Sequence, residues 1–196
     1  MLRIGLTGGI GSGKSEALRA FAARGAAVLS SDDVVHRLYA DPEVVSAVRE
    51  RFGDDILARD GSVDRTVLGE AAFAGDGLEF LEGLLYPRIS AAREAWVAEQ
   101  RAADPLPPVL VCEVPLLFEA GLVDRFDGVL VVTAPDDVRR RRVEERGQDF
   151  HERSARQLPE GEKVARADMA YVNDGSVDDL GAWVQSVIDR YPAARS

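Results

Sequence analysis

Short apolar runs alternate along the chain with longer segments in which apolar side chains recur at helical spacing. Each run is long enough for one buried strand, and the runs span residues 2–6, 26–29, 109–114, 128–132 and 169–172. The amphipathic segments predict helices over residues 14–24, 32–39, 44–52, 65–73, 78–103, 135–146 and 177–191. Strands that alternate with helices favour a parallel sheet covered on both faces. The pattern therefore predicts an α/β fold with a parallel five-stranded sheet flanked by helices.

A long helical block, from about residue 34 to residue 104, separates the second predicted strand from the third. It is much longer than the crossover that usually joins two parallel strands. We interpret it as an inserted helical subdomain that binds a substrate. Within it, Pro87 lacks the N–H group that a helix interior uses, which predicts a kink or a break near Tyr86.

A glycine-rich sequence follows the first predicted strand and precedes the first predicted helix. It reads Gly8-Gly9-Ile10-Gly11-Ser12-Gly13-Lys14-Ser15 and fits the pattern G-x-x-x-x-G-K-[ST]. Glycines let the backbone curl so that several N–H groups point at one spot, and the helix N-terminus adds to that positive field. We expect Lys14 to reach the β- and γ-phosphates of ATP and the Ser15 hydroxyl to bind Mg²⁺. A glycine-rich turn without a ligand is the alternative, which the lysine, the hydroxyl and the context disfavour.

Acidic side chains follow two of the other predicted strands. Asp32 and Asp33 come after the second strand, at the edge where such sheets bind ligands. A carboxylate there can orient an acceptor hydroxyl or take its proton. It can equally be a favourable charge at the start of a helix, and the residues alone do not decide between the two. Glu113, at the end of the third strand, is a candidate to assist Mg²⁺ through water.

Arginines cluster in the helix predicted over residues 135–146. Arg142 and Arg146 lie one helical turn apart and, with Arg153, have the spacing and chemistry to clamp phosphate oxygens. We expect Arg139 and Arg141 to lie instead on a solvated face, paired with nearby acids.

Composition and charge narrow the possible partners. The formal net charge of −10 disfavours a general nucleic-acid-binding protein, which needs a basic face. No run reaches the roughly 18 apolar residues that cross a bilayer, and the N-terminal segment does not read as a secretory leader. Cys112 is the only cysteine, and His36 and His151 lack the spacing of a zinc site. We therefore expect a cytoplasmic monomer or weak homo-oligomer that binds neither nucleic acid nor membrane.

Four further segments stand out. They are Val28-Leu29-Ser30-Ser31-Asp32-Asp33, Leu84-Leu85-Tyr86-Pro87-Arg88-Ile89, Val114-Pro115-Leu116-Leu117-Phe118-Glu119, and a tail with Gln157, Lys163, Ala167-Asp168, Asn173 and Gly175-Ser176. Together with the glycine-rich loop, and in this order, they resemble dephospho-CoA kinases over nearly the whole chain. The resemblance implies an enzyme that uses ATP and Mg²⁺ to phosphorylate the 3′-hydroxyl of dephospho-CoA, the last step of coenzyme A biosynthesis.

The resemblance also implies a division of labour along the chain. The implied parts are a P-loop NTPase-like core at residues 1–33, 105–138 and 168–196, a helical part for the coenzyme A moiety at about 34–104, and a lid at about 139–167. Asp32 is implied to orient or deprotonate the hydroxyl, while Lys14 and Arg142 neutralise transferring charge. The implied ATP contacts are Gly9, Ile10, Gly11, Ser12, Gly13, Lys14, Ser15, Glu16, Arg146 and Asn173, and the implied metal ligand is Ser15.

The chain departs from the family pattern in several places. Ser30 replaces the first acid of the usual Asp-x-Asp, and a shift of one residue would make Asp33 rather than Asp32 the base. Tyr86 stands where a histidine is usual and cannot titrate near neutrality. Glu16 replaces a common threonine, and its carboxylate is expected to turn away from the phosphates. The lid is about four residues short, roughly one helical turn.

Other function classes share part of this pattern. A kinase of the same fold that phosphorylates a nucleoside monophosphate or another small metabolite would not be expected to carry both the Pro115-to-Glu119 segment and the tail. A nucleotide-binding switch without transfer activity would need elements that sense the γ-phosphate and a partner surface, and no guanine-reading Asn-Lys-x-Asp motif is found. An inactive relative is the third alternative, raised by Glu16, Ser30 and Tyr86.

Overall fold

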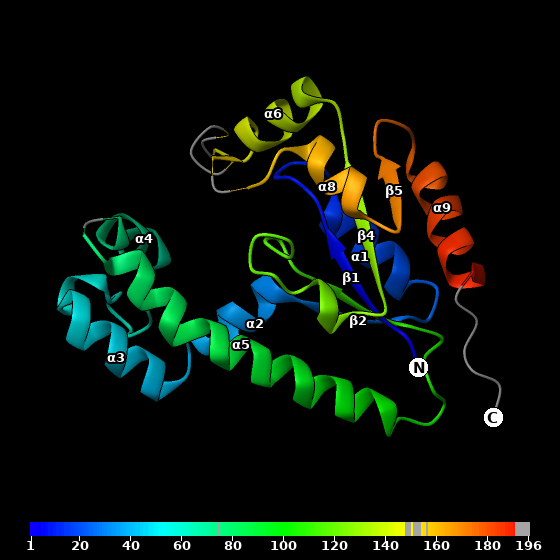
Figure 1. Ribbon diagram of the computed structural model, residues 1–196. Coiled ribbons are helices and arrows are strands. Elements are labelled where there is room, and N and C mark those ends of the chain that lie inside the picture. Colours follow the sequence, from blue (N-terminus) through cyan, green and yellow to red (C-terminus); the bar gives the residue numbers. More distant parts are fainter. Residues whose placement is uncertain (74, 148–149, 151–153, 156, 191–196) are drawn as a thin grey trace. The chain divides into compact units, whose positions relative to one another are not determined.

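The computed structural model describes residues 1–73, 75–147, 150, 154–155 and 157–190 (Figure 1). The chain forms two compact units. The first joins Met1–Ser30 to Glu99–Ser196, and the second is Ser31–Ala98. Each unit has an apolar core of its own.

The first unit is built on a parallel five-stranded sheet, which confirms the fold predicted from the strand pattern. The strands are β1 (Arg3–Thr7), β2 (Ala27–Ser30), β3 (Leu110–Glu113), β4 (Gly128–Thr133) and β5 (Met169–Val172). Their order across the sheet is β2-β3-β1-β4-β5, and all neighbours are parallel. Because β1 is central, the loop after it leaves from the middle of the carboxyl edge, where open α/β sheets bind ligands.

Two helices, α1 (Lys14–Ala22) and α9 (Val177–Arg190), pack together against this sheet (Figure 1). Phe21 of α1 meets Trp183 of α9 edge-on, with 6.2 Å between the ring centroids. Phe21 and Leu6 of β1 are fully buried in the same cluster. Burying one such side chain contributes about 1.5–3 kcal/mol, so the core holds the start of α1 firmly against β1.

Two further helices, α6 (Asp136–Glu144) and α8 (Glu160–Arg166), are described in the first unit, together with the 3₁₀ turn η2 (Val123–Arg125). α6 lies within the predicted helix over residues 135–146. α8 has no counterpart in the sequence prediction, because a helix of seven residues is too short to display a clear apolar period.

The second unit is helical. Its elements are α2 (Ser31–Leu38), α3 (Pro42–Phe52), the 3₁₀ turn η1 (Asp54–Ile56), α4 (Arg65–Ala72) and most of α5 (Gly77–Arg101). Asp41 and Asp64 cap α3 and α4 by accepting hydrogen bonds from first-turn N–H groups. The core of the unit gathers the buried side chains Val44, Val48, Ile56, Leu68, Leu81 and Leu85. Apolar packing and capping therefore stabilise these short helices together.

Helix α5 continues through Pro87, so the alternative of a break near Tyr86 is wrong. Proline removes one donor from the helix and crowds the carbonyl one turn before it. At that turn the Arg88 guanidinium donates to the carbonyl of Leu84 over 2.9 Å. The packing of α5 into the core, through Leu81, Leu85 and Ile89, holds the helix on both sides of the proline.

Candidate active site

The glycine-rich loop occupies residues 8–13, between β1 and α1, and its glycines are needed for two separate reasons. Gly11 and Gly13 have φ angles of 75° and 97°, a region that side-chain-bearing residues rarely adopt. A Cβ atom at Gly11 would lie 2.5 Å from the Arg139 carbonyl oxygen, and one at Gly13 would collide with the Asn173 amide. The backbone of the loop is therefore both curled and closely surrounded.

Lys14 begins helix α1 directly after this loop. Its Nζ donates to the carbonyl oxygen of Gly9 over 3.0 Å, so the ammonium group lies across the mouth of the loop. Gly13 at the N-cap offers no side-chain oxygen to the first-turn N–H groups. The helix N-terminus thus presents its amides and its positive dipole where a phosphate group would sit.

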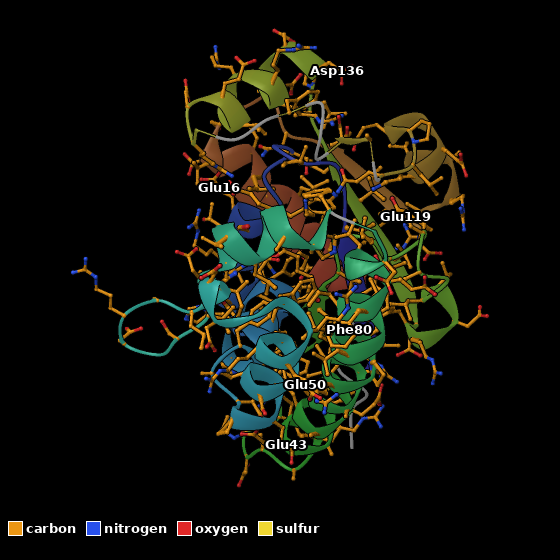
Figure 2. All side chains as sticks on the ribbon, turned by 90° about the vertical axis from the view of Figure 1, so that its left-hand side faces the viewer. Glu16, Glu43, Glu50, Phe80, Glu119 and Asp136 are labelled. Carbon is orange, nitrogen blue, oxygen red and sulfur yellow. The ribbon has the colours of Figure 1, made fainter. Side chains whose placement is uncertain are left out.

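The two residues after Lys14 are exposed at the start of α1. Ser15 is the second residue of α1, and its role as a metal ligand stays a prediction. Glu16 lies 3.8 Å from Arg19 of the same helix and faces solvent (Figure 2). Turned outward in this way, the Glu16 carboxylate is kept from crowding an anion in the loop; a direct contact between Glu16 and ATP stays a prediction.

Helix α6 brings two arginines to the loop. Arg142 donates to the carbonyl oxygens of Gly11 and Asn173, each over 3.3 Å. Arg139 donates through Nε to the Ile10 carbonyl over 3.1 Å and is only 5% exposed. The expectation that Arg139 lies on a solvated face is therefore wrong, because its guanidinium is buried between the Ile10 carbonyl and the carboxylates of Asp136, at 3.2 Å, and Glu160, at 3.7 Å.

The other arginines of this region, Arg141 and the two remaining members of the predicted clamp, Arg146 and Arg153, are placed differently. Arg141 is exposed and 3.9 Å from Glu145, as expected for a solvated pair. Arg146 is exposed in the turn after α6, so the helix does not extend far enough to place it beside Arg142 on one regular face. Arg153 lies outside the described residues.

Asn173, directly after β5, is buried and meets the loop from another side. Its Nδ2 donates to the Ser12 carbonyl oxygen over 2.9 Å, and its own N–H donates to Thr133 of β4 over 2.7 Å. The chain after β5 is therefore fastened both to the sheet and to the loop. The predicted contact of Asn173 with ATP stays a prediction, but its place at the loop is a structural fact.

Residues 157–163, which the sequence assigned to the lid, also contact the glycine-rich loop, and these contacts were not predicted. Gln157 accepts a hydrogen bond from the Ile10 N–H over 3.0 Å. A side chain at Gly9 would collide with the Glu160 carboxylate, which lies 3.7 Å from Arg139. In the sequence, only the spacing of Gln157 and Lys163, which resembles that of the family, marked this segment. That spacing alone does not indicate which groups the two side chains contact.

Lys163 lies at the other end of this segment and is fully buried. Its Nζ is 2.9 Å from Oε1 of Glu119, which also accepts from the Leu158 N–H over 2.8 Å. Glu119, which is labelled in Figure 2, lies in the loop between β3 and η2. Burial by itself raises the pKa of Glu119, but the bonds from Lys163 and from the backbone outweigh it and hold the pKa below its ordinary value.

The acids predicted to serve the acceptor and the metal occupy different parts of the structure. Asp32 and Asp33 are exposed in the first turn of α2, where both interact favourably with the helix dipole. Glu113 is buried at the end of β3, paired in register with Leu6 of β1 and Ser30 of β2. The last residue of β2 is thus beside Glu113, and the chain passes from there into α2.

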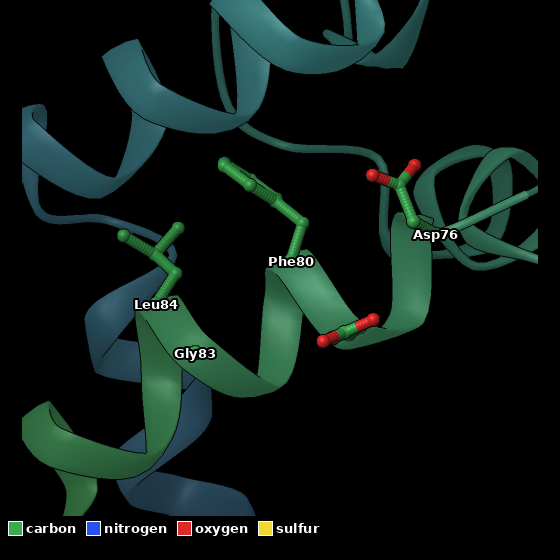
Figure 3. Close-up of a pocket in the computed structure, with 5 residues that line it drawn as sticks. Asp76, Phe80, Gly83 and Leu84 are labelled. Atoms are coloured by element: carbon green, nitrogen blue, oxygen red, sulfur yellow. The ribbon is translucent and has the colours of Figure 1, made fainter.

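The second unit also has a surface hollow of about 390 Å³, lined by Asp76, Glu79, Phe80, Gly83 and Leu84 (Figure 3). Phe80 and Leu84 project from the same side of α5, with Asp76 just before the helix. Asp76 pairs with Arg51, whose guanidinium lies 6.0 Å from the Phe80 ring centroid. The carboxylates of Asp76 and Glu79 repel an anion, and Arg51 is already paired with Asp76. This hollow is therefore unsuited to binding a phosphate group.

The donors available for a metal fit Mg²⁺ bound together with ATP. Within the described ranges, no three His, Cys, Asp or Glu side chains gather into a protein cage. Mg²⁺ does not need one, because it usually keeps several waters and takes one or two protein oxygens plus substrate phosphates. The Ser15 hydroxyl at the loop meets that requirement. Separately, no helix among the described residues has the length and apolar character to span a bilayer.

Known proteins resemble this chain in sequence and in structure. Residues 2–179 match the model of the dephospho-CoA kinase family. The dephospho-CoA kinase of Mycolicibacterium paratuberculosis is 42% identical over 194 residues, which cover 95% of this chain and 46% of that protein. The dephospho-CoA kinase of Streptomyces avermitilis is 39% identical over 186 residues, covering 92% and 89%. This chain therefore spans about half the length of the first relative and most of the second.

A solved structure, that of TT1252 from Thermus thermophilus, has a similar fold. It matches with a TM-score of 0.79 at 32% sequence identity and covers 96% of this chain and 97% of that one.

Proposed function

The chain belongs to the dephospho-CoA kinase family, and we propose that it transfers the terminal phosphoryl group of ATP to the 3′-hydroxyl of dephospho-CoA. The observation that carries this proposal is the glycine-rich loop, curled at Gly11 and Gly13 and gripped by Arg139, Arg142 and Asn173. Phosphoryl transfer needs positioning and charge neutralisation more than covalent chemistry. A loop held in this shape before the phosphates arrive meets the first need.

The phosphates of ATP are proposed to bind the N–H groups of residues 11–15 and the Lys14 ammonium. Lys14 is half-buried and bonded to the Gly9 carbonyl, a neutral acceptor. A phosphate oxygen is a stronger acceptor for an ammonium group because the bond is charge-assisted. Lys14 would therefore exchange the carbonyl for the β- and γ-phosphates when ATP binds.

Ser15 is proposed to hold Mg²⁺ through its hydroxyl, with Glu113 assisting through water. A bound Mg²⁺ supplies neutralisation of charge on the phosphate oxygens. Glu113 is buried at the carboxyl end of β3, one strand away from the loop that follows β1.

Arg142 is proposed to neutralise the charge that develops on the transferred group, with Arg146 in support. A guanidinium carries five N–H donors. Its bonds to the carbonyls of Gly11 and Asn173 use two of its nitrogens and orient the group towards the loop. Arg142 is thus able to keep its backbone contacts while its remaining donors face a phosphate.

Asp32 is proposed to orient the 3′-hydroxyl or to accept its proton, with Asp33 as the alternative. Support comes from the position of β2, whose last residue Ser30 ends at the same sheet edge as the glycine-rich loop. The chain reaches Asp32 two residues later. Both carboxylates are exposed in the first turn of α2.

The proposal is tested by measuring ADP release with a panel of acceptors. ADP release that depends on dephospho-CoA, with coenzyme A identified as the product, is the expected result. Release only with a nucleoside monophosphate or another small metabolite would replace dephospho-CoA as the acceptor. ATP binding without release in the presence of any acceptor would favour a binding module.

The setting of the reaction follows from its chemistry. The consumption of ATP supports the cytoplasm as the location, and a site assembled within one chain supports a monomer or weak homo-oligomer.

A further inference from the structure

Lys163 is an unusual residue to find with no exposed surface. It projects from α8, and its Nζ lies 2.9 Å from the Glu119 carboxylate, which is itself largely buried. Taking both charges out of water is costly, and a buried ion pair gains little stability over an apolar pair of the same shape. The pair therefore calls for an explanation in terms of what it holds in place.

Two further contacts join the same two segments of chain. The backbone N–H of Leu158 donates to Glu119 over 2.8 Å. The Arg166 guanidinium lies 4.6 Å from the ring centroid of Phe118, the residue before Glu119. Residues 158–166 are thus attached to the loop after β3 at both ends and near the middle. Attachment of this kind fixes the position of the whole segment.

The residue just before the attached segment contacts the glycine-rich loop. Gln157 Oε1 accepts the hydrogen bond from the Ile10 N–H, and its neighbour Leu158 is the residue held by Glu119. The Ile10 N–H lies at the start of the loop, before the amides of residues 11–15 that face the phosphates. A fixed partner for this amide holds the entry to the loop in one conformation.

We propose that Glu119 and Lys163 are a positioning pair that sets Gln157 against the Ile10 amide and so shapes the glycine-rich loop before ATP arrives. The inference rests on the proposed function, since it concerns how the same loop binds nucleotide. Neither charge is among the groups proposed to contact the nucleotide. A preshaped loop loses less conformational entropy on binding, so the pair raises nucleotide affinity through Gln157.

A double-mutant cycle between Lys163 and Gln157 tests this chain of contacts. ADP affinity is measured by calorimetry for the parent, Lys163→Met, Gln157→Ala and the double variant. Each single change is expected to weaken ADP binding about fivefold, the factor of one typical hydrogen bond. The double variant is expected to bind ADP no worse than either single variant, because both changes act through the hydrogen bond between Gln157 and the Ile10 N–H. Gln185→Ala, an exposed glutamine of α9, is the matched control and should bind as the parent does.

Independent structural roles predict a different result. If the two changes multiplied to about 25-fold, Lys163 would act on the loop by another route and the proposal would be wrong. Unchanged or tighter ADP binding by Gln157→Ala would equally overturn it. Should Lys163→Met fail to fold, the paired variant Glu119→Gln/Lys163→Met replaces it in the cycle, because it removes both charges and leaves no buried ion without its partner.

The measurement separates this proposal from the proposed function. ADP binding involves no acceptor, so the cycle gives its answer whichever molecule is phosphorylated. A failure to phosphorylate dephospho-CoA with an intact cycle would reject the substrate alone. Activity on dephospho-CoA with additive effects in the cycle would reject the positioning pair alone.

Discussion

Asn173 donates from Nδ2 to the carbonyl oxygen of Ser12 over 2.9 Å, with both residues buried. One side chain thereby joins the end of β5 to the centre of the glycine-rich loop, across 161 residues of sequence. The bond explains why residue 13 must be glycine, since the amide of Asn173 fills the space that a Cβ would need.

Replacing Asn173 by alanine should destabilise the protein and weaken nucleotide binding together. The change leaves the buried Ser12 carbonyl without its donor, at a cost of about 2 kcal/mol. Urea unfolding followed by circular dichroism measures the loss, and the KM for ATP should rise in parallel. Asp174→Ala, at the exposed next position, is the control and should change neither. Equal effects of the two substitutions would contradict the assigned contact.

Gly13→Ala should abolish ATP binding, whereas Gly25→Ala should not. Both glycines have positive φ angles, 97° and 82°, so both substitutions carry a backbone strain of about 1–2 kcal/mol. Only Gly13 has a neighbour in the way, because nothing lies within 4 Å of a Cβ at Gly25. Calorimetric titration with ATP, alongside thermal unfolding, separates the two effects. If Gly25→Ala lost ATP binding as well, general strain and not the Asn173 contact would be responsible.

Lys14→Ala should lower kcat about 100-fold or more while the fold remains intact. The loss follows from removing a cation placed at the charge that develops during transfer. Steady-state kinetics with ATP and dephospho-CoA measure it, and circular dichroism checks the fold. Arg19→Ala removes an exposed cation of the same helix and should leave kcat near the parent value. Parent-like turnover by Lys14→Ala would remove the lysine from the site.

Arg139→Met should lower the free energy of unfolding more than Arg141→Met does, although the two positions are only two residues apart on α6. Arg139 is buried and donates to the Ile10 carbonyl, so its loss should cost about 1.5–3 kcal/mol. Arg141 is exposed and pairs with Glu145 over 3.9 Å, a contact of about 0–1 kcal/mol. Urea midpoints of the two variants provide the comparison. Similar losses would mean that the burial of Arg139 does not matter for stability.

The Glu119 carboxylate should make stability depend on pH in the acid range. Its pKa is below the ordinary value of 4.5, because Lys163 and the Leu158 N–H stabilise the ionised form more than burial disfavours it. A lowered folded-state pKa contributes stability that is present above pH 4.5 and is lost as the pH falls through the folded value. Glu119→Gln leaves a buried ammonium without its carboxylate, at a cost of about 3–5 kcal/mol near neutrality.

The difference between the parent and Glu119→Gln should therefore shrink as the pH is lowered below 4.5. Urea midpoints measured across this range provide the test. A difference that stays constant with pH would show that the charge of Glu119 does not stabilise the fold.

The sequence predicted the helices of the second unit but not the continuation of α5 through Pro87. Pro87 predicts an interruption because the local rule concerns only the backbone. The bond from the Arg88 guanidinium to Leu84 and the burial of the preceding turn are particular to this helix. Tertiary packing overrides a local preference of this kind.

The position of Arg139 was also not predictable from the local sequence. In a run of arginines, sequence spacing tells which side chains share a face but not which face meets the rest of the protein. α6 buries Arg139 against Ile10 and leaves Arg141 in solvent. The direction in which a helix is turned depends on its packing, which has no local signature.

The sequence by itself determined the parallel sheet, the glycine-rich loop and the start of α1, because each follows from the pattern of a few neighbouring residues. Only the tertiary structure decided which distant side chains hold that loop: Arg139, Arg142, Gln157 and Asn173. The physical reason is range. Strands, helices and a phosphate-binding turn arise from interactions between residues that are close in sequence. A buried hydrogen bond between segments far apart in the chain forms only when the core has brought those segments together.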